Sequence, residues 1–133
     1  MIHLTPEQRI FTIERHLATL ATLRADGSPH VTPVGFTWDA DHGWANITTM
    51  DYSVKVRNAS GYADGAPRAA LCQVDGGRWI TLEGTIAVVR DPQEIELAVA
   101  NYTKRYSAPE PNPARIVLRL TVDNVMSSDY MAR

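Results

Sequence analysis

The sequence predicts a mainly β (α+β) fold, an antiparallel barrel of six strands with short flanking helices. Two segments indicate hairpin turns, Ala25–Ser28 and Asp75–Gly77, because each contains an Asp-Gly pair that can supply positive φ angles. A length of 133 residues and a hydrophobic content of 44% allow one domain with a packed core. We therefore expect residues 1–133 to form a single domain, and a dimer would add burial that a small barrel lacks.

The first expected element is a helix that begins at Pro6. Thr5 offers a capping hydroxyl, Pro6 takes the first helical position, and Gln8 stands three residues after the cap. The next element is a strand over Leu17–Leu23. It is small and apolar throughout, which is the pattern of a strand buried on both faces.

The second strand is expected over His30–Trp38, and it contains Pro33 and Gly35. Proline cannot donate to a ladder, and glycine leaves a gap in the surface of a strand. The two residues indicate either a local break where a flat ligand touches the backbone, or an edge strand with a bulge. The sequence favours neither alternative.

Alternating or apolar patterns predict four more strands, at Trp44–Thr49, Ala69–Val74, Arg78–Arg90 and Arg115–Val125. Capping residues predict two more helices. One covers Ser53–Ser60, with Asp51 or Ser53 as its cap and Gly61 as its end. The other begins after Asp91 and runs to about residue 106, with an expected buried stripe of Ile95, Ala98, Val99, Tyr102 and Tyr106.

Composition excludes several classes of function. Thirteen Lys plus Arg against fifteen Asp plus Glu give a net charge of −2, which argues against a nucleic-acid binder. The chain has neither a signal-peptide pattern nor a membrane-length apolar stretch, so we expect a cytoplasmic protein without membrane contact. Four histidines without ligand spacing and a single cysteine predict no metal site. No nucleophile or acid–base motif appears, so no catalytic side chain is assigned, and a bound cofactor would carry any reaction.

The segment 47–58 has the pattern of a ligand site. A strand ends at two threonines, and the chain then enters a helix whose free N–H groups and dipole favour an anion. Lys55 and Asn58 lie on one helical face, and a lysine in a first turn is unfavourable unless an anion lies there too. The segment therefore predicts a phosphate site, and the alternative is a solvated lysine with Asp51 as its counter-charge.

Four segments together resemble a known family. They are Leu20–Phe36 (LATLRADGSPHVTPVGF), the Lys55-x-x-Asn58 pair, Leu71–Gly84 (LCQVDGGRWITLEG) and Tyr102–Arg115 (YTKRYSAPEPNPAR). The first two resemble the split β-barrel flavin and deazaflavin oxidoreductases, the superfamily of pyridoxamine-phosphate oxidase. The last two are similar to the branch that uses coenzyme F420, and within it to the F420-dependent biliverdin reductases. The resemblance covers nearly the whole chain.

The resemblance implies a homodimer of six-stranded split barrels with two cofactor sites at the subunit interface. It implies cofactor contacts, some of them from the facing subunit, at Thr32, Pro33, Val34, Thr48, Ser53, Lys55, Val56, Asn58, Gln73 and Trp79. It also implies substrate contacts at Arg105 and Tyr106. The glutamate tail of F420 would pass basic residues without obvious acidic neighbours, or these residues solvate the surface: Arg57, Arg68, Arg78, Lys104 and Arg105.

Three hypotheses follow. The first is an F420H2-dependent reductase that transfers hydride to a conjugated small molecule, with biliverdin as one candidate. The second is an FMN-binding oxidase or reductase of the same fold, and a basic run leading away from the phosphate distinguishes F420 from FMN. The third is a protein that carries a cofactor or tetrapyrrole without turnover. In the family, the phosphate-binding helix often has another basic residue near the position of Ser53. This chain lacks that basic residue.

Overall fold

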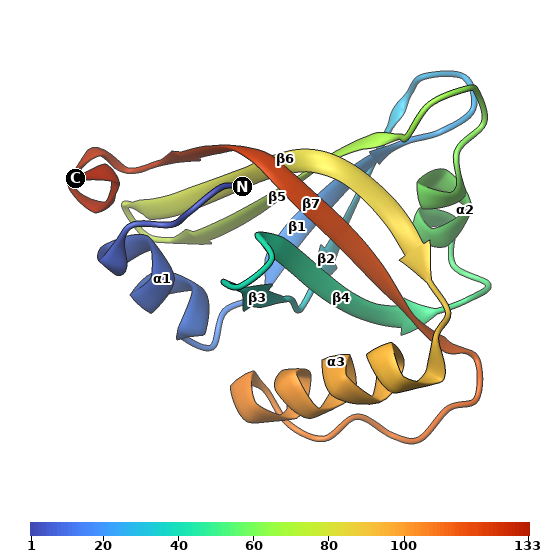
Figure 1. Ribbon diagram of the computed structural model, residues 1–133. Helices are drawn as coiled ribbons and strands as arrows, with labels where there is room; N and C mark the ends of the chain where they lie inside the picture. Colours follow the sequence, from blue (N-terminus) through green and yellow to red (C-terminus); the bar gives the residue numbers. More distant parts are fainter.

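The computed structural model describes all 133 residues and contains one antiparallel sheet of seven strands (Figure 1). The strands are β1 (Ala18–Leu23), β2 (Pro29–Val34), β3 (Thr37–Asp39), β4 (Trp44–Met50), β5 (Arg68–Asp75), β6 (Arg78–Val89) and β7 (Arg115–Ser127). The helices are α1 (Pro6–Ile13), α2 (Val54–Ser60), α3 (Pro92–Arg105) and the short 3-10 helix η1 (Asp129–Ala132). The sheet order is β2-β1-β5-β6-β7-β4-β3, which leaves β2 and β3 unpaired with each other, so the sheet is not closed.

The prediction of six strands is wrong by one, because the segment 30–38 forms parts of two strands. β2 ends at Val34 and β3 begins at Thr37, and the two strands lie at opposite edges of the sheet. The interruption falls at Gly35, where the rings of two α3 tyrosines leave no space for a side chain: a Cβ there would lie 2.8 Å from Tyr102 Cε2. The local break is therefore confirmed, and Pro33 does lie on an edge strand, where its missing N–H is tolerated.

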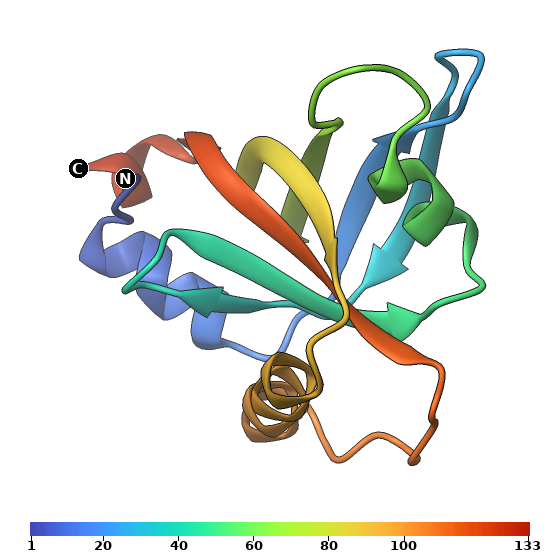
Figure 2. The same ribbon diagram turned by 45° about the vertical axis from the view of Figure 1, so that its right-hand side comes forward.

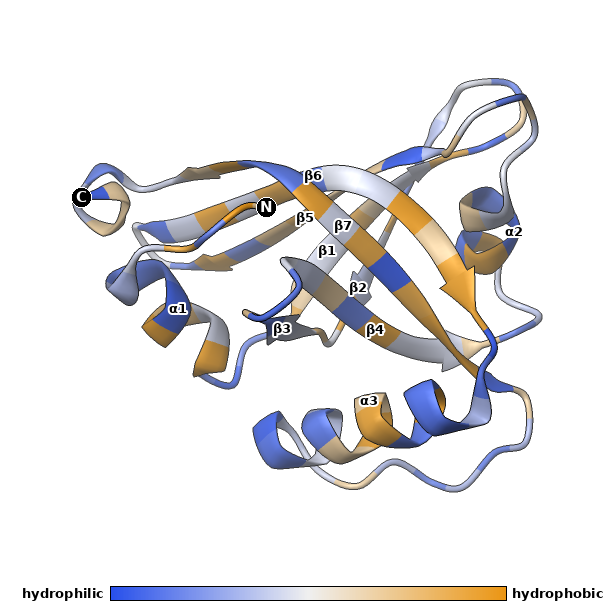
Figure 3. Cartoon of the chain, viewed as in Figure 1, coloured by the Kyte–Doolittle hydropathy of each residue, from blue (hydrophilic) through white to orange (hydrophobic).

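The prediction that the first strand is buried on both faces is also wrong. Ala18, Leu20 and Thr22 of β1 point into the core, whereas the alternate residues are partly or fully exposed. The reason is that the helices of the chain lie elsewhere and leave the outer face of β1 and its neighbours uncovered (Figures 1 and 2). Hydrophobic and polar residues alternate along the long strands, as Figure 3 shows for β6 and β7. The inner faces of all the strands together supply 14 of the 20 buried residues in the core cluster.

The helices begin where the capping residues predict. Thr5 and Gln8 form the expected capping box, and the Asp91 side chain accepts hydrogen bonds from the first amides of α3. In α3 only Ala98 of the expected stripe is fully buried, because the helix packs on one side against the sheet and is otherwise exposed. α1 and α2 lie at opposite ends of the sheet, and α3 lies beneath β4 and β7 (Figure 2). None of the helices combines the length and apolarity that crossing a bilayer requires.

Candidate functional site

Lys55, in the first turn of α2, has no acidic partner. The side chain is half-buried, no carboxylate oxygen lies within 4.0 Å of its ammonium group, and burial lowers its pKa below the usual value of 10.5. Asp51, the expected counter-charge, instead forms an ion pair with Arg90 at 2.6 Å. The alternative of a lysine balanced by Asp51 is therefore wrong, and the ammonium group is free to meet an external anion.

Ser53 lies at the N-cap of α2, but its side chain makes no capping hydrogen bond. Its Oγ atom is buried and has no hydrogen-bond partner in the protein. Thr48 lies close in sequence, half-buried near the end of β4. Buried hydroxyls are nearly always hydrogen-bonded, so the unsatisfied Ser53 hydroxyl two residues before an unpaired lysine fits an oxygen-rich anion such as a phosphate.

Thr32, Pro33 and Val34 lie on β2, whose outer edge pairs with no strand. A free edge presents backbone groups to a ligand, as the sequence predicted for a flat ring. Residue 30 of the same strand was not expected in the site. His30 shares the inner face of β2 with Thr32, and its Nδ1 atom is buried without a partner. The sequence did offer a signal for His30, because residues two apart on a strand, such as His30 and Thr32, lie on the same face.

Asn58 and Val56 point into the protein. Asn58 donates to Thr22 Oγ1 at 2.9 Å and accepts from Tyr62 Oη at 2.7 Å, so both polar ends of its side chain are engaged. Val56 is part of the core cluster. Helical spacing predicts that Asn58 and Lys55 share a face of α2, whereas tertiary packing decides how α2 is rotated against the sheet. The expected cofactor contacts of Asn58 and Val56 stay predictions. The observed role of these two residues is to fix α2 against β1.

Gln73 and Trp79 have different environments. The Gln73 side chain is buried, donates to the Phe11 carbonyl at 2.8 Å and accepts from Arg105. It joins α1 to the sheet within this subunit, and its expected cofactor contact stays a prediction. Trp79 lies on the uncovered outer face of the sheet with 37% of its surface exposed, so it remains available to a ligand or a second subunit.

Arg105 and Tyr106 at the end of α3 are held by backbone groups. Arg105 donates to the Glu14 carbonyl at 2.8 and 3.0 Å, to the Phe36 carbonyl and to Gln73. Tyr106 Oη donates to the His16 carbonyl at 2.7 Å and accepts from the Phe36 amide at 3.2 Å. Burial lowers the pKa of Arg105 and raises the pKa of Tyr106. Within the chain both residues fix the β2–β3 connection, and their expected substrate contacts stay predictions.

Two of the five basic candidates form ion pairs that the sequence did not indicate. Arg68 pairs with Asp123, and Arg78 pairs with both Glu14 and Asp75. These acids lie far away in the sequence or across a hairpin. Arg57 and Lys104 have no acid within 4.0 Å, and of these two only Arg57 shares α2 with Lys55.

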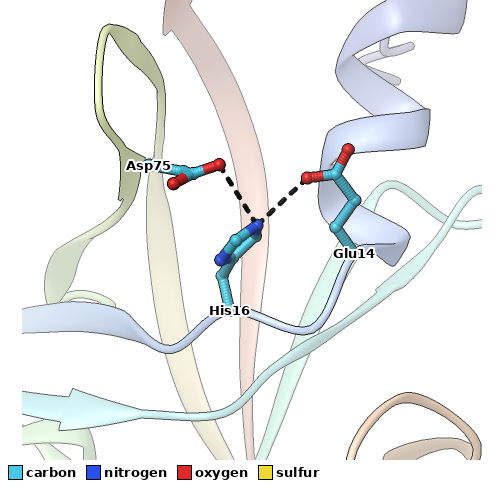
Figure 4. Close-up of side chains that lie close together, drawn as sticks. All are labelled: Glu14, His16 and Asp75. Atoms are coloured by element: carbon cyan, nitrogen blue, oxygen red, sulfur yellow. Dashed lines mark hydrogen bonds and ion pairs between the residues drawn. The ribbon is translucent and has the colours of Figure 1, made fainter.

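Glu14, His16 and Asp75 gather at one end of the sheet (Figure 4). His16 Nε2 lies 3.0 Å from Glu14 Oε1 and 3.7 Å from Asp75 Oδ2. Arg78 binds both carboxylates, and its hydrogen bonds lower the pKa of Glu14 to about 2. A cation already balances the two acids, so we assign no metal to this cluster.

The structure contains two substantial cavities. One, of about 600 Å³, lies between α1, α3 and the turn from β3 to β4. The other, of about 660 Å³, lies between α3 and the proline-rich segment that precedes β7. Neither is lined by Ser53, Lys55 or the segment 32–34, so the predicted phosphate and ring sites lie outside these two cavities.

Comparisons with known proteins agree with this architecture. Residues 4–128 match the family model described as pyridoxamine 5'-phosphate oxidase. The chain is 44% identical over 125 residues to the F420H(2)-dependent biliverdin reductase of Mycobacterium tuberculosis, covering 94% of this chain and 88% of that protein.

Solved structures share the fold at lower identity. A conserved hypothetical protein from Mycobacterium tuberculosis superimposes with a TM-score of 0.80 and 23% identity, covering 98% of this chain and 87% of that one. A structure described as an F420 reductase gives a TM-score of 0.71 and 22% identity, covering 89% and 94% of the two chains.

Proposed function

The chain belongs to the pyridoxamine 5'-phosphate oxidase family, and we propose that it is an F420H2-dependent reductase of a conjugated small molecule. The relative that shares 44% of its residues is named for this cofactor and for biliverdin, which makes biliverdin the first acceptor to test. The observation that carries the proposal is that two unpartnered polar groups lie two residues apart: the half-buried ammonium of Lys55, which has no acidic partner, and the buried hydroxyl of Ser53, which has no hydrogen bond.

Lys55 and Ser53 would hold the phosphate of F420, with Thr48 beside them on β4 and Arg57 toward the charged tail. The free edge of β2 would support the ring through the backbone of residues 32–34. When bound, reduced F420 would supply a hydride to the acceptor, and the proton would come from solvent or from a nearby arginine. The protein contributes binding and orientation, which agrees with the lack of an acid–base motif in the sequence.

The assembly that we propose is a homodimer joined through the outer face of the sheet. The register places Pro33, Thr19, Cys72, Thr81 and Met126 in one row across five strands on this face. The row has no charged residue, and no helix of the chain covers it. Association of two copies would remove this surface from water and would bring a second subunit beside β2.

Val31 adjoins this row and is 61% exposed. Val31→Glu should therefore convert the dimer to a monomer without unfolding the chain, as measured by light scattering after size-exclusion chromatography. Ile10→Glu, an equally exposed apolar position on α1, is the control. A dimer that persists unchanged in Val31→Glu would place the interface elsewhere.

The function is tested by mixing the protein with reduced F420 and biliverdin and following the return of oxidised F420 absorbance. Lys55→Ala should weaken F420 binding by about a hundredfold or more, because it removes a charged phosphate contact. Lys104→Ala, the other lysine of the chain, should leave F420 affinity unchanged. Tight F420 binding without turnover would indicate a carrier or another acceptor, and preference for FMN would indicate the flavin-dependent alternative.

A further inference from the structure

The cavity between α1 and α3 has a positively charged lining with no assigned role. Arg9 contributes from α1, and Lys104 and Arg105 contribute from the last turn of α3. None of the three cations has a carboxylate within 4.0 Å. Arg105 is the most deeply placed, and its charge meets only neutral oxygen atoms, those of two backbone carbonyls and the Gln73 amide. A desolvated cation without an anion favours an anionic ligand.

The two acids of the same lining, Asp39 and Asp41, form no ion pair with these cations. Asp39 is held by the His42 ring at 2.9 Å and by the backbone amides of Asp41 and His42. Asp41 is exposed at the rim. The positive charges of the lining therefore lie on the α1 and α3 sides, and its carboxylates lie at β3 and the turn that follows.

Apolar side chains of the lining offer contact to the body of a ligand. Ile13 of α1 and Leu97 of α3 are 71% and 58% exposed, although both line the cavity. Trp38 of β3 adds a half-buried aromatic ring. A volume of about 600 Å³ lies within the range of small-molecule sites. Together with the cations, these walls suit a large conjugated molecule that carries carboxylates.

The cavity is continuous in sequence with the segment expected to support the cofactor ring. β2 ends at Val34, and Thr37 and Trp38 already line the cavity. Arg105 binds the Phe36 carbonyl between them. We propose that this cavity binds the carboxylate-bearing end of the conjugated acceptor, with Arg9 and Lys104 as its anion-binding residues and the charge of Arg105 behind them. This inference rests on the proposed function, because the proposed function identifies the ligand as the hydride acceptor.

The test uses biliverdin, which has two carboxylates, and its neutral dimethyl ester, each titrated into the full-length protein. Wild type should bind the acid about tenfold or more tightly than the ester. Arg9→Ala and Lys104→Ala should each weaken binding of the acid about tenfold and leave the ester unaffected. Arg15→Ala, an exposed arginine outside the cavity, is the matched control.

A charge introduced at Leu97, on the α3 side of the cavity, gives a second test of anion binding. Leu97→Glu should weaken binding of the acid, and Leu97→Lys should maintain or strengthen it, because Leu97 is exposed and either residue suits a helix. Equal affinity for acid and ester, or unchanged affinity in the Arg9 and Lys104 variants, would overturn the proposal. The F420 affinity is measured separately. If F420 binds but the acid is not preferred over the ester, only the cavity assignment is overturned. If the acid is preferred but F420 does not bind, only the proposed function is overturned.

Discussion

The guanidinium of Arg105 donates a hydrogen bond to the Phe36 carbonyl oxygen and lies 4.6 Å from the centre of the Phe36 ring. Phe36 lies in the two-residue connection between β2 and β3, and its own ring is buried in the core. The same guanidinium binds the Glu14 carbonyl near the end of α1. One side chain therefore joins the end of α3, the end of α1 and the connection that follows the proposed ring site.

Replacing Arg105 by Met should destabilise the protein by about 2 kcal/mol. The change relieves the desolvation of the guanidinium, but it leaves partly buried carbonyls without donors, and this second effect is the larger. Chemical denaturation measures the difference. Arg15→Met, at an exposed arginine without hydrogen bonds, should change stability by less than about 0.5 kcal/mol. Equal stability of the two variants would show that Arg105 does not hold these segments.

Gly35→Ala should also destabilise the protein, by about 1–3 kcal/mol. The new Cβ would lie 2.8 Å from Tyr102 Cε2 and 3.0 Å from Tyr106 Cε2, so the two tyrosine rings must shift. Thermal unfolding measures the effect. Gly77→Ala is the matched control, because a Cβ at Gly77 meets no atom within 4 Å. A Gly35→Ala variant as stable as Gly77→Ala would contradict the close packing of α3 on this connection.

The affinity for F420 should fall with rising pH through the pKa of Lys55. Burial places this pKa below 10.5, and only the protonated ammonium attracts phosphate, so binding is strongest below that pKa and is lost above it. Dissociation constants measured from neutral pH to about pH 10 test this. Lys55→Arg keeps its charge over the whole interval and should show a flatter profile. Parallel profiles for wild type and Lys55→Arg would assign the pH dependence to another group.

Glu14 should stabilise the protein at neutral pH and lose this effect in acid. Its pKa is lowered to about 2 from a usual value of 4.5, so the stabilisation is complete above about pH 4.5 and disappears as the pH falls toward 2. Urea denaturation of Glu14→Gln should therefore differ from wild type at pH 7 and converge with it in acid. Glu96→Gln, at an exposed carboxylate without an ion pair, should follow wild type throughout. A constant difference for Glu14→Gln would contradict the ion pair.

The sequence predicted the features that depend on near neighbours along the chain. Both Asp-Gly hairpins, the caps at Thr5 and Asp91 and the end of α2 at Gly61 are confirmed. Capping and turn formation involve residues within four positions of one another, so a single segment contains the whole interaction. The motifs spread over the chain likewise indicated the family that the comparisons show.

Only the tertiary structure decided what the side chains of the site contact. Gln73 meets the Phe11 carbonyl across 62 positions, Arg78 meets Glu14 across 64, and Arg105 meets Glu14 across 91. Such pairs form because the curled sheet brings distant segments together, and no spacing in the sequence encodes them. Lys55 shows the opposite outcome. Folding gave Arg78 an acidic partner, whereas it partly buried Lys55 and left it without one. Short-range hydrogen bonding determined the elements, and long-range packing determined which charges remained available to a ligand.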